Sequence, residues 1–141
     1  MMTKVALSNH SAVRVRRAER ERIRSFYRDV LGGQIMRMFD DKDDIRLGDD
    51  FYIAFLYSGG DGKGPDKGVN YAAEDALGDG DFLKAIFLEL KTDDVDSMRK
   101  RIIAFGVKVL NVPDPHLYFQ APGGQVFRLV GVNEDLSQYE G

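Results

Sequence analysis

The sequence contains no cysteine and no apolar run long enough to span a bilayer. The absence of cysteine excludes disulfides, iron–sulfur clusters and thiolate chemistry, and it fits a reducing compartment. Residues 1–10 lack the apolar core of a usual signal peptide, and no later segment could cross a membrane. These absences predict a soluble, cytoplasmic protein with no membrane partner.

The chain also has little excess charge, since 20 basic and 23 acidic residues give a formal net charge of -3. Broad nucleic-acid binding needs a basic face that replaces phosphate counterions, so no nucleic-acid partner is expected. The one basic run, residues 14–28, is interleaved with acidic residues and is interpreted as the solvated face of a helix. The length of 141 residues suits one domain with one core.

A first set of elements is predicted before residue 58. Residues 10–15 alternate as a strand does, with Val13 and Val15 on one face. A helix is expected over residues 18–31, because apolar residues recur there at helical spacing and two glycines follow. Three short strands, separated by acidic and glycine-containing turns, are then expected at residues 34–39, 44–47 and 51–57.

Residues 58–81 separate this set from the next and are rich in glycine. Their segment GGDGKG is not interpreted as a phosphate-binding loop, because Pro65 and Asp66 follow Lys63 where a Ser or Thr and a helix are needed. The segment is therefore interpreted as a flexible linker that contains a short helix around residues 71–77.

The same order of elements returns after the linker. Residues 82–90 are predicted to form a strand, and a helix follows that begins at residues 92–94 and ends at Gly106. Three further strands are expected at residues 107–112, 116–120 and 125–132. The order strand–helix–strand–strand–strand thus occurs twice, which indicates an α+β fold.

We therefore expect a single domain over residues 1–141. Module one is placed at about residues 9–58 and module two at about residues 82–132. Each module is a βαβββ unit, and the curved mixed sheets of the two are expected to surround a shared cavity.

This doubled unit resembles the vicinal-oxygen-chelate superfamily, which includes glyoxalases, bleomycin-resistance proteins and extradiol dioxygenases. The segment HSAVRV and the helix end SFYRDVLGG resemble the opening strand and first helix of that superfamily. The turn APGG and the strand QVFRLVG resemble its closing turn and last strand. The likeness covers about residues 10–132.

Metal-dependent members take four ligands from the paired modules, usually His or Gln on each first strand and Glu on each last strand. The resemblance places these ligands at His10, Ala54, Ala85 and Arg128, of which only His10 could bind a metal. A guanidinium stays protonated, and at ~5 Å and an effective dielectric near 20 it repels a dication by on the order of 6 kcal/mol. No metal and no cofactor are therefore expected. A displaced metal site would require His10, Glu89 and His116 to converge.

Strand parity and the resemblance together predict residues that face the cavity. The expected ligand-binding set is His10, Arg14, Tyr52, Phe87, Glu89, Tyr118 and Arg128. Leu56, Val126 and Val130 are expected to complete an apolar wall.

Two alternatives stay open for this set. Arg128 either binds an anionic ligand or pairs internally with Glu89, because an unpaired buried guanidinium is costly. His116, Tyr118 and Gln120 alternate along one strand, so they either reach the cavity or form the solvent face of an edge strand.

The resemblance implies a metal-free, small-molecule-binding protein similar to bleomycin-resistance proteins, which usually hold their ligand at a homodimer interface. The two arginines predict an anionic or carboxylate-bearing ligand. The long linker would also allow the modules to pair across chains. An alternative is a lyase, isomerase or dioxygenase of the glyoxalase type, with a relocated metal or with His10 and Glu89 as metal-free acid–base residues. A protein–protein module is a third, so the sequence leaves open whether the protein is an enzyme.

Overall fold

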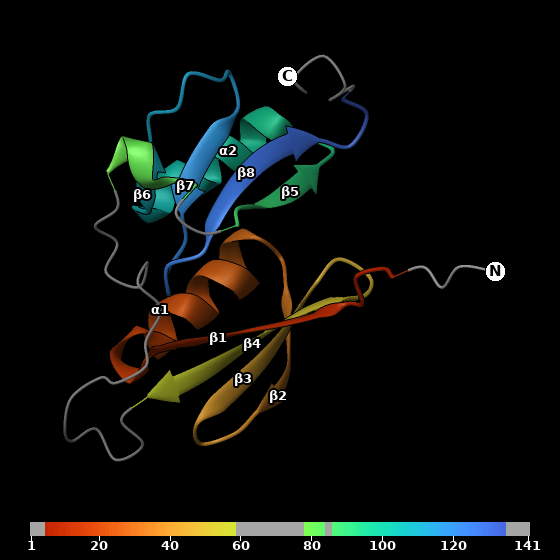
Figure 1. Cartoon of the computed structure of the whole chain (residues 1–141), viewed down its shortest axis with the longest axis vertical. Helices are drawn as coiled ribbons and strands as arrows, with labels where there is room; N and C mark the ends of the chain where they lie inside the picture. The colour runs from red at the N-terminus through yellow and green to blue at the C-terminus, as the bar shows by residue number, and fades with distance from the viewer. Residues whose placement is uncertain (1–4, 59–77, 84–85, 135–141) are drawn as a thin grey trace.

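The computed structural model of the chain describes residues 5–58, 78–83 and 86–134 (Figure 1). The strands of the first module are β1 (His10–Arg16), β2 (Gln34–Met38), β3 (Lys42–Leu47) and β4 (Phe51–Ser58). The elements of the second module are β5 (Leu88–Thr92), α2 (Val95–Phe105), β6 (Lys108–Leu110), β7 (Leu117–Gln120) and β8 (Val126–Gly131). A 3₁₀ turn at Asp79–Asp81 precedes the second module.

The strands form two four-stranded sheets of the same order, β1-β4-β3-β2 and β5-β8-β7-β6. In each sheet the first strand pairs in parallel with the last strand of its module, and the other pairs are antiparallel. The sheets are therefore mixed, and the predicted α+β fold with two βαβββ modules is confirmed.

The helix of the first module changes its winding along its length. A 3₁₀ turn (Arg17–Glu19) leads into α1 (Arg20–Arg24), which continues as a π-helical segment (Ser25–Val30). The amide of Leu31 donates to the carbonyl of Phe26 at 3.1 Å, which is the wider hydrogen bond of a π turn. The predicted helix at residues 18–31 is thus confirmed in extent, while the change of winding was not foreseen.

Several strand limits differ from the predictions. The first strand of module two begins at Leu88, whereas Phe82 follows a 3₁₀ turn and does not lie in a strand. β6 is shorter than the predicted 107–112, and β7 begins one residue after His116. The short helix expected at residues 71–77 lies outside the described residues.

The main apolar core lies between the two sheets, with the α1 helix in its centre (Figure 1). The ring centroid of Tyr27 lies 5.0 Å from that of Phe55 on β4 and 6.2 Å from that of Phe127 on β8. Phe26 similarly lies 5.8 Å from Phe119 on β7. The helix segment therefore packs against both sheets at once.

This packing turns the opposite face of each sheet away from the core. On β1, Val15 belongs to the core while His10 and Arg14 are exposed; on β8, Phe127 belongs to the core while Arg128 does not. We call these outward-facing surfaces the open faces of the two sheets. On the second sheet, Leu110, Tyr118 and Val126 are themselves buried on this face, in a smaller apolar cluster with Phe82, Phe87 and Val112. Because the open faces lie on opposite sides of the core, the expected shared cavity is not formed between the described residues of one chain.

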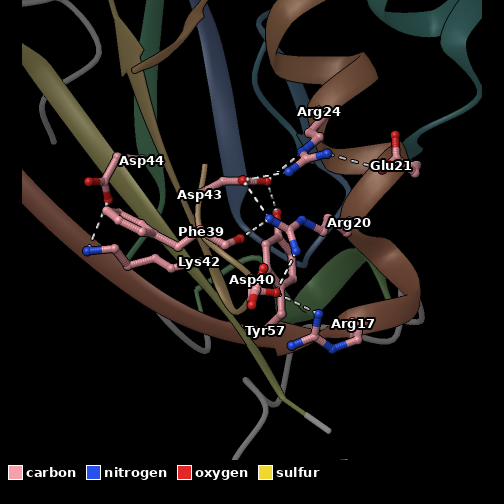
Figure 2. A network of polar contacts seen from close by, with 10 residues as sticks. All are labelled: Arg17, Arg20, Glu21, Arg24, Phe39, Asp40, Lys42, Asp43, Asp44 and Tyr57. Atoms are coloured by element: carbon pink, nitrogen blue, oxygen red, sulfur yellow. Dashed lines mark hydrogen bonds and ion pairs between the residues drawn. The ribbon is translucent and has the colours of Figure 1, made fainter. Parts of the chain in front are cut away.

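A buried carboxylate fastens the first helix to its sheet (Figure 2). Asp43 is fully buried and accepts hydrogen bonds from Arg24 at 2.8 and 2.9 Å, from Arg20 at 3.1 Å and from the hydroxyl of Tyr57 at 2.7 Å. Burial alone raises the pKa of Asp43, but these hydrogen bonds outweigh it and hold the pKa below its ordinary value.

This network corrects two sequence interpretations. Asp43 was assigned to a turn, but it lies on β3 and points toward the core. The basic run at residues 14–28 was assigned to a solvated helix face, but Arg20 and Arg24 turn inward to Asp43. Both errors have the same cause. Asp43 is distant in the sequence from Arg20 and Arg24, and only the folded chain brings their opposite charges together.

Within the described part of the chain, no helix is long and apolar enough to cross a membrane.

Candidate ligand-binding site

Arg128 occupies the centre of the open face of the second sheet. The register of the sheet places Arg128 on β8 between Glu89 on β5 and Tyr118 on β7. Its Nε donates to Glu89 Oε2 at 2.8 Å, Nη2 contacts the same oxygen, and Nη1 donates to the Tyr118 hydroxyl at 3.1 Å. The predicted internal ion pair between Arg128 and Glu89 is therefore confirmed.

Aromatic rings surround this guanidinium. Its central carbon lies 5.1 Å from the ring centroid of Phe87 and 5.8 Å from that of Tyr118, within cation–π range. Phe87 and Phe82 each meet the ring of Tyr118 edge-on, at 5.5 and 5.3 Å between centroids. The open face thus combines one cation with a small apolar platform, an arrangement suited to an aromatic anion.

The guanidinium remains charged in this environment. Burial alone lowers the pKa of Arg128, but hydrogen bonds to Glu89 and Tyr118 outweigh the burial and raise the pKa. The site therefore offers a permanent cation and cannot supply a proton acceptor at Arg128.

A second set of polar residues extends the site past Tyr118. The Tyr118 hydroxyl donates to Asp114 Oδ2 at 2.9 Å, and Asp114 Oδ2 lies 3.5 Å from Arg128 Nη1. The other oxygen of Asp114 accepts from the backbone amide of His116 at 2.9 Å and contacts His116 Nδ1. His116 Nε2 in turn contacts Glu134, which follows β8.

These positions decide between the two alternatives that the sequence left open for residues 116–120. β7 lies between β8 and β6, so it is not an edge strand. Tyr118 and Gln120 are buried, and the His116 side chain is only 7% exposed. The solvent-face alternative is therefore wrong, and Tyr118 takes part in the Arg128 cluster. No sequence signal singled out Asp114, because its place in the cluster depends on its contact with Arg128, which lies on another strand.

The open face of the first sheet carries a second group of predicted site residues. His10 stacks on Tyr52 with ring centroids 4.9 Å apart and nearly parallel planes, and its Nδ1 lies 2.8 Å from the side-chain oxygen of Asn9. Arg14 lies on the same face, opposite Leu56, and is exposed. The predicted shared parity of His10 and Arg14 is confirmed.

The structure brings together one part of the predicted set and separates the other. Phe87, Glu89, Tyr118 and Arg128 form one cluster, whereas His10, Arg14 and Tyr52 lie on the other sheet. The displaced metal site suggested for His10, Glu89 and His116 is wrong for one chain, because each has different neighbours. Among the described residues, no three His, Asp or Glu side chains gather in a way that would hold a metal ion.

The residues at the family's ligand positions do not fit a divalent metal. Ala54 has no donor atom, and Arg128 holds a fixed positive charge against Glu89. Ala85 lies outside the described residues. The strand register shows which residue of module two corresponds to His10. Ala12 pairs with Ala54 on β4, and Glu89 pairs with Arg128 on β8, so Glu89 corresponds to Ala12. Phe87, two residues before Glu89, therefore corresponds to His10, two residues before Ala12. Phe87 has no donor atom that could bind a metal either.

A cleft of about 530 Å³ lies beside the edge strand β5 and reaches the turn between β3 and β4. Glu89, the partner of Arg128, is among the residues that line it. The other lining residues are both apolar and polar: Leu47, Phe51, Leu88, Leu90 and Phe127, and Gly48, Asp49, Asp50 and Lys91. The cleft was not predicted, because it arises from the packing of one module against the other.

Three comparisons place this geometry among known proteins. Residues 8–123 match the model of the Glyoxalase/Bleomycin resistance protein/Dioxygenase superfamily. No curated protein matches the chain. Among solved structures, an integron cassette protein from the mobile metagenome of V. cholerae is 17% identical with a TM-score of 0.63, over 94% of this chain and 100% of that one.

Two further solved structures have described ligands or roles. TnmS3, an antibiotic binding protein from a Streptomyces species, is 19% identical with a TM-score of 0.55, over 92% of this chain and 98% of that one. A mutant of the fosfomycin resistance protein FosX from Listeria monocytogenes, complexed with Mn(II) and 1S,2S-dihydroxypropylphosphonic acid, is 14% identical with a TM-score of 0.60, over 97% and 100% of the chains. At these identities the likeness concerns the fold. With its family match over residues 8–123 and its two βαβββ modules, the chain belongs to the glyoxalase/bleomycin resistance protein/dioxygenase superfamily.

Proposed function

We propose that this protein binds an anionic, carboxylate-bearing aromatic small molecule without using a metal. The observation that carries the proposal is the position of Arg128, which replaces a metal ligand of the family and lies beside the rings of Phe87 and Tyr118. An arginine matches the planar geometry of a carboxylate, and the adjacent rings would cover an aromatic body. TnmS3, described as an antibiotic binding protein, supports a binding role for this fold.

A ligand anion would bind Arg128 by displacing Glu89, its ion-pair partner within the chain. The Glu89 side chain is 37% exposed, so it has room to turn into solvent when a ligand anion takes its place on Arg128. Tyr118 would keep its hydrogen bond to Nη1 and hold the guanidinium in the plane that the ligand meets. The ligand would therefore replace one ion pair with another and leave no guanidinium unpaired.

We propose further that a homodimer completes the cavity. Each open face forms one wall only, and the two walls of one chain lie on opposite sides of its core. A second copy would bring the first module of one chain opposite the second module of the other. Arg14, which has no ion-pair partner among the described residues, would then lie across the cavity from the partner's Arg128 and add to its attraction for anions.

The binding proposal is tested by thermal-shift measurements with a panel of aromatic carboxylates and sulfonates. We expect stabilisation of the native protein and loss of that stabilisation in Arg128→Gln. The matched control is Arg99→Gln on the exposed side of α2, which should respond as the native protein does. Stabilisation by micromolar divalent metal that is lost in His10→Ala would instead favour a metal-dependent enzyme and overturn the proposal.

The dimer proposal is tested by complementation. Arg14→Gln and Arg128→Gln chains should each bind poorly alone, because every cavity of either homodimer carries one defect. A mixed dimer would contain one cavity with both native arginines and one with neither, so mixing should restore binding in a fraction of the cavities. If mixing restores nothing while both variants remain dimeric, the cavity is not shared between chains.

A further inference from the structure

His116 lies between two carboxylates, and this placement selects its protonation state. Nδ1 contacts Asp114 Oδ1 and Nε2 contacts Glu134 Oε1, while the side chain is only 7% exposed. The imidazolium donates from both ring nitrogens, whereas the neutral ring would direct a lone pair at one of the two carboxylates. The doubly protonated ring therefore fits both contacts, and the neutral ring fits only one.

Asp114 connects this imidazolium to the Arg128 site. Its Oδ1 faces His116, and its Oδ2 accepts from the Tyr118 hydroxyl at 2.9 Å and lies 3.5 Å from Arg128 Nη1. Asp114 is thus a counter-ion for two cations at once. The more strongly His116 attracts it, the less of its charge is directed at Arg128.

The local charge balance predicts how the protonation of His116 affects the binding of an anion at Arg128. Among the described residues, and with the imidazolium present, two cations, Arg128 and His116, face three carboxylates, Glu89, Asp114 and Glu134. Loss of the imidazolium proton leaves one cation against the same three carboxylates. An anion at Arg128 then meets one more unit of net negative charge and stronger competition from Asp114.

We propose that His116 is a positioning residue of the anion site: its imidazolium holds Asp114 and keeps the Arg128 guanidinium available to an anionic ligand. This inference rests on the proposed binding function. It makes ligand affinity fall as the pH rises through the titration of His116.

The electrostatic surroundings raise the pKa of His116 above its ordinary value. Burial lowers the pKa of His116, but its contacts with Glu134 and Asp114 outweigh burial and raise the pKa. The folded protein therefore favours the imidazolium, and the affinity should decline as the pH rises through a pKa of His116 that lies above its ordinary value.

The test uses anilinonaphthalenesulfonate, an aromatic anion whose sulfonate stays ionised throughout the measurement. Its dissociation constant is measured by fluorescence from about pH 6 to about pH 9 at constant ionic strength. For the native protein we expect a rise of roughly fivefold across the titration of His116, and for His116→Gln a flat profile. Arg99→Gln, at an exposed position of α2 away from both open faces, is the control, and it should keep the native slope.

A second measurement decides the question if His116→Gln does not fold. With two histidines in the chain, proton NMR resolves two imidazole titrations, and His10→Gln assigns them. Because coupling between two binding events is reciprocal, saturation with the probe should raise the pKa of His116. A pKa of His116 that does not change on probe binding would overturn the inference.

The outcomes separate this inference from the proposed function. Unchanged probe binding in Arg128→Gln at every pH would reject the anion site itself. Weakened binding in Arg128→Gln, together with equal pH profiles for the native protein and His116→Gln, would reject only the role of His116.

Discussion

Asp43→Asn is expected to destabilise the protein by about 3 kcal/mol, although the substitution hardly changes the size of the side chain. Removing one partner of a buried ion pair costs about 3–5 kcal/mol, because the other charge stays behind unpaired. Here the charges left behind, Arg20 and Arg24, are 15% and 17% exposed and keep partial access to water, which favours the lower end of that range. The asparagine oxygen would still accept the hydrogen bond from Tyr57.

The assay is urea unfolding at a fixed protein concentration, because a dimer would make the midpoint depend on concentration. The adjacent Asp44→Asn is a closely matched control (Figure 2). Asp44 lies on the opposite face of β3, 20% exposed, with Lys42 3.6 Å away. Surface pairs of this kind contribute about 0–1 kcal/mol, so the control should lose much less stability.

The pH dependence gives an independent check. The pKa of Asp43 is lowered from its ordinary value of 3.8 in the folded state, so its stabilisation is present above that value. It is lost as the pH falls through the folded-state pKa. The difference between the native protein and Asp43→Asn should therefore shrink in acid. A difference that persists unchanged at about pH 2, or an equal loss in Asp44→Asn, would refute the reasoning.

Three further substitutions, the first with a matched control, test local structure by the same urea assay. Gly123→Ala should cost about 2 kcal/mol, because φ is 89° and the new Cβ would lie 3.0 Å from Ile23 Cδ1; Gly80→Ala, in open space, should be neutral. Tyr27→Phe should leave stability unchanged or raise it by about 1 kcal/mol, since the buried hydroxyl has no hydrogen-bond partner among the described residues; a clear loss would show a missing partner. Asp94→Ala should cost about 1 kcal/mol by removing the N-cap of α2.

The parts of the fold that the sequence predicted depend on local periodicity. Alternation in β1 placed His10 and Arg14 on one face and Val15 on the other, as the structure has them. The isolated charge of Arg128 within an apolar strand predicted a nearby carboxylate, and Glu89 is that partner. These predictions needed only the alternation within one strand or the pairing of two strands.

The parts that were missed depend on contacts between elements. The apolar stripe of the first helix predicted a buried face, but it did not show that Phe26 and Tyr27 would contact the second sheet as well as the first. The orientation of the modules, and with it the separation of His10 from Arg128, follows from that contact. Asp114 was missed for a similar reason, because its place in the cluster depends on its contact with Arg128 on β8, although His116 and Tyr118 lie close to it in the sequence.

The exposure of the counter-ion distinguishes Arg128, the proposed binding arginine, from the structural arginine Arg24. The side chains of Arg24 and Arg128 are almost equally covered, at 17% and 16% exposed. The carboxylate that holds Arg24 is completely buried, so replacing it with a ligand would require the helix to leave its sheet. The carboxylate that holds Arg128 is 37% exposed and lies at the edge strand of an open face. An anion could displace the second partner without disturbing the core, and this difference supports the proposed ligand site around Arg128.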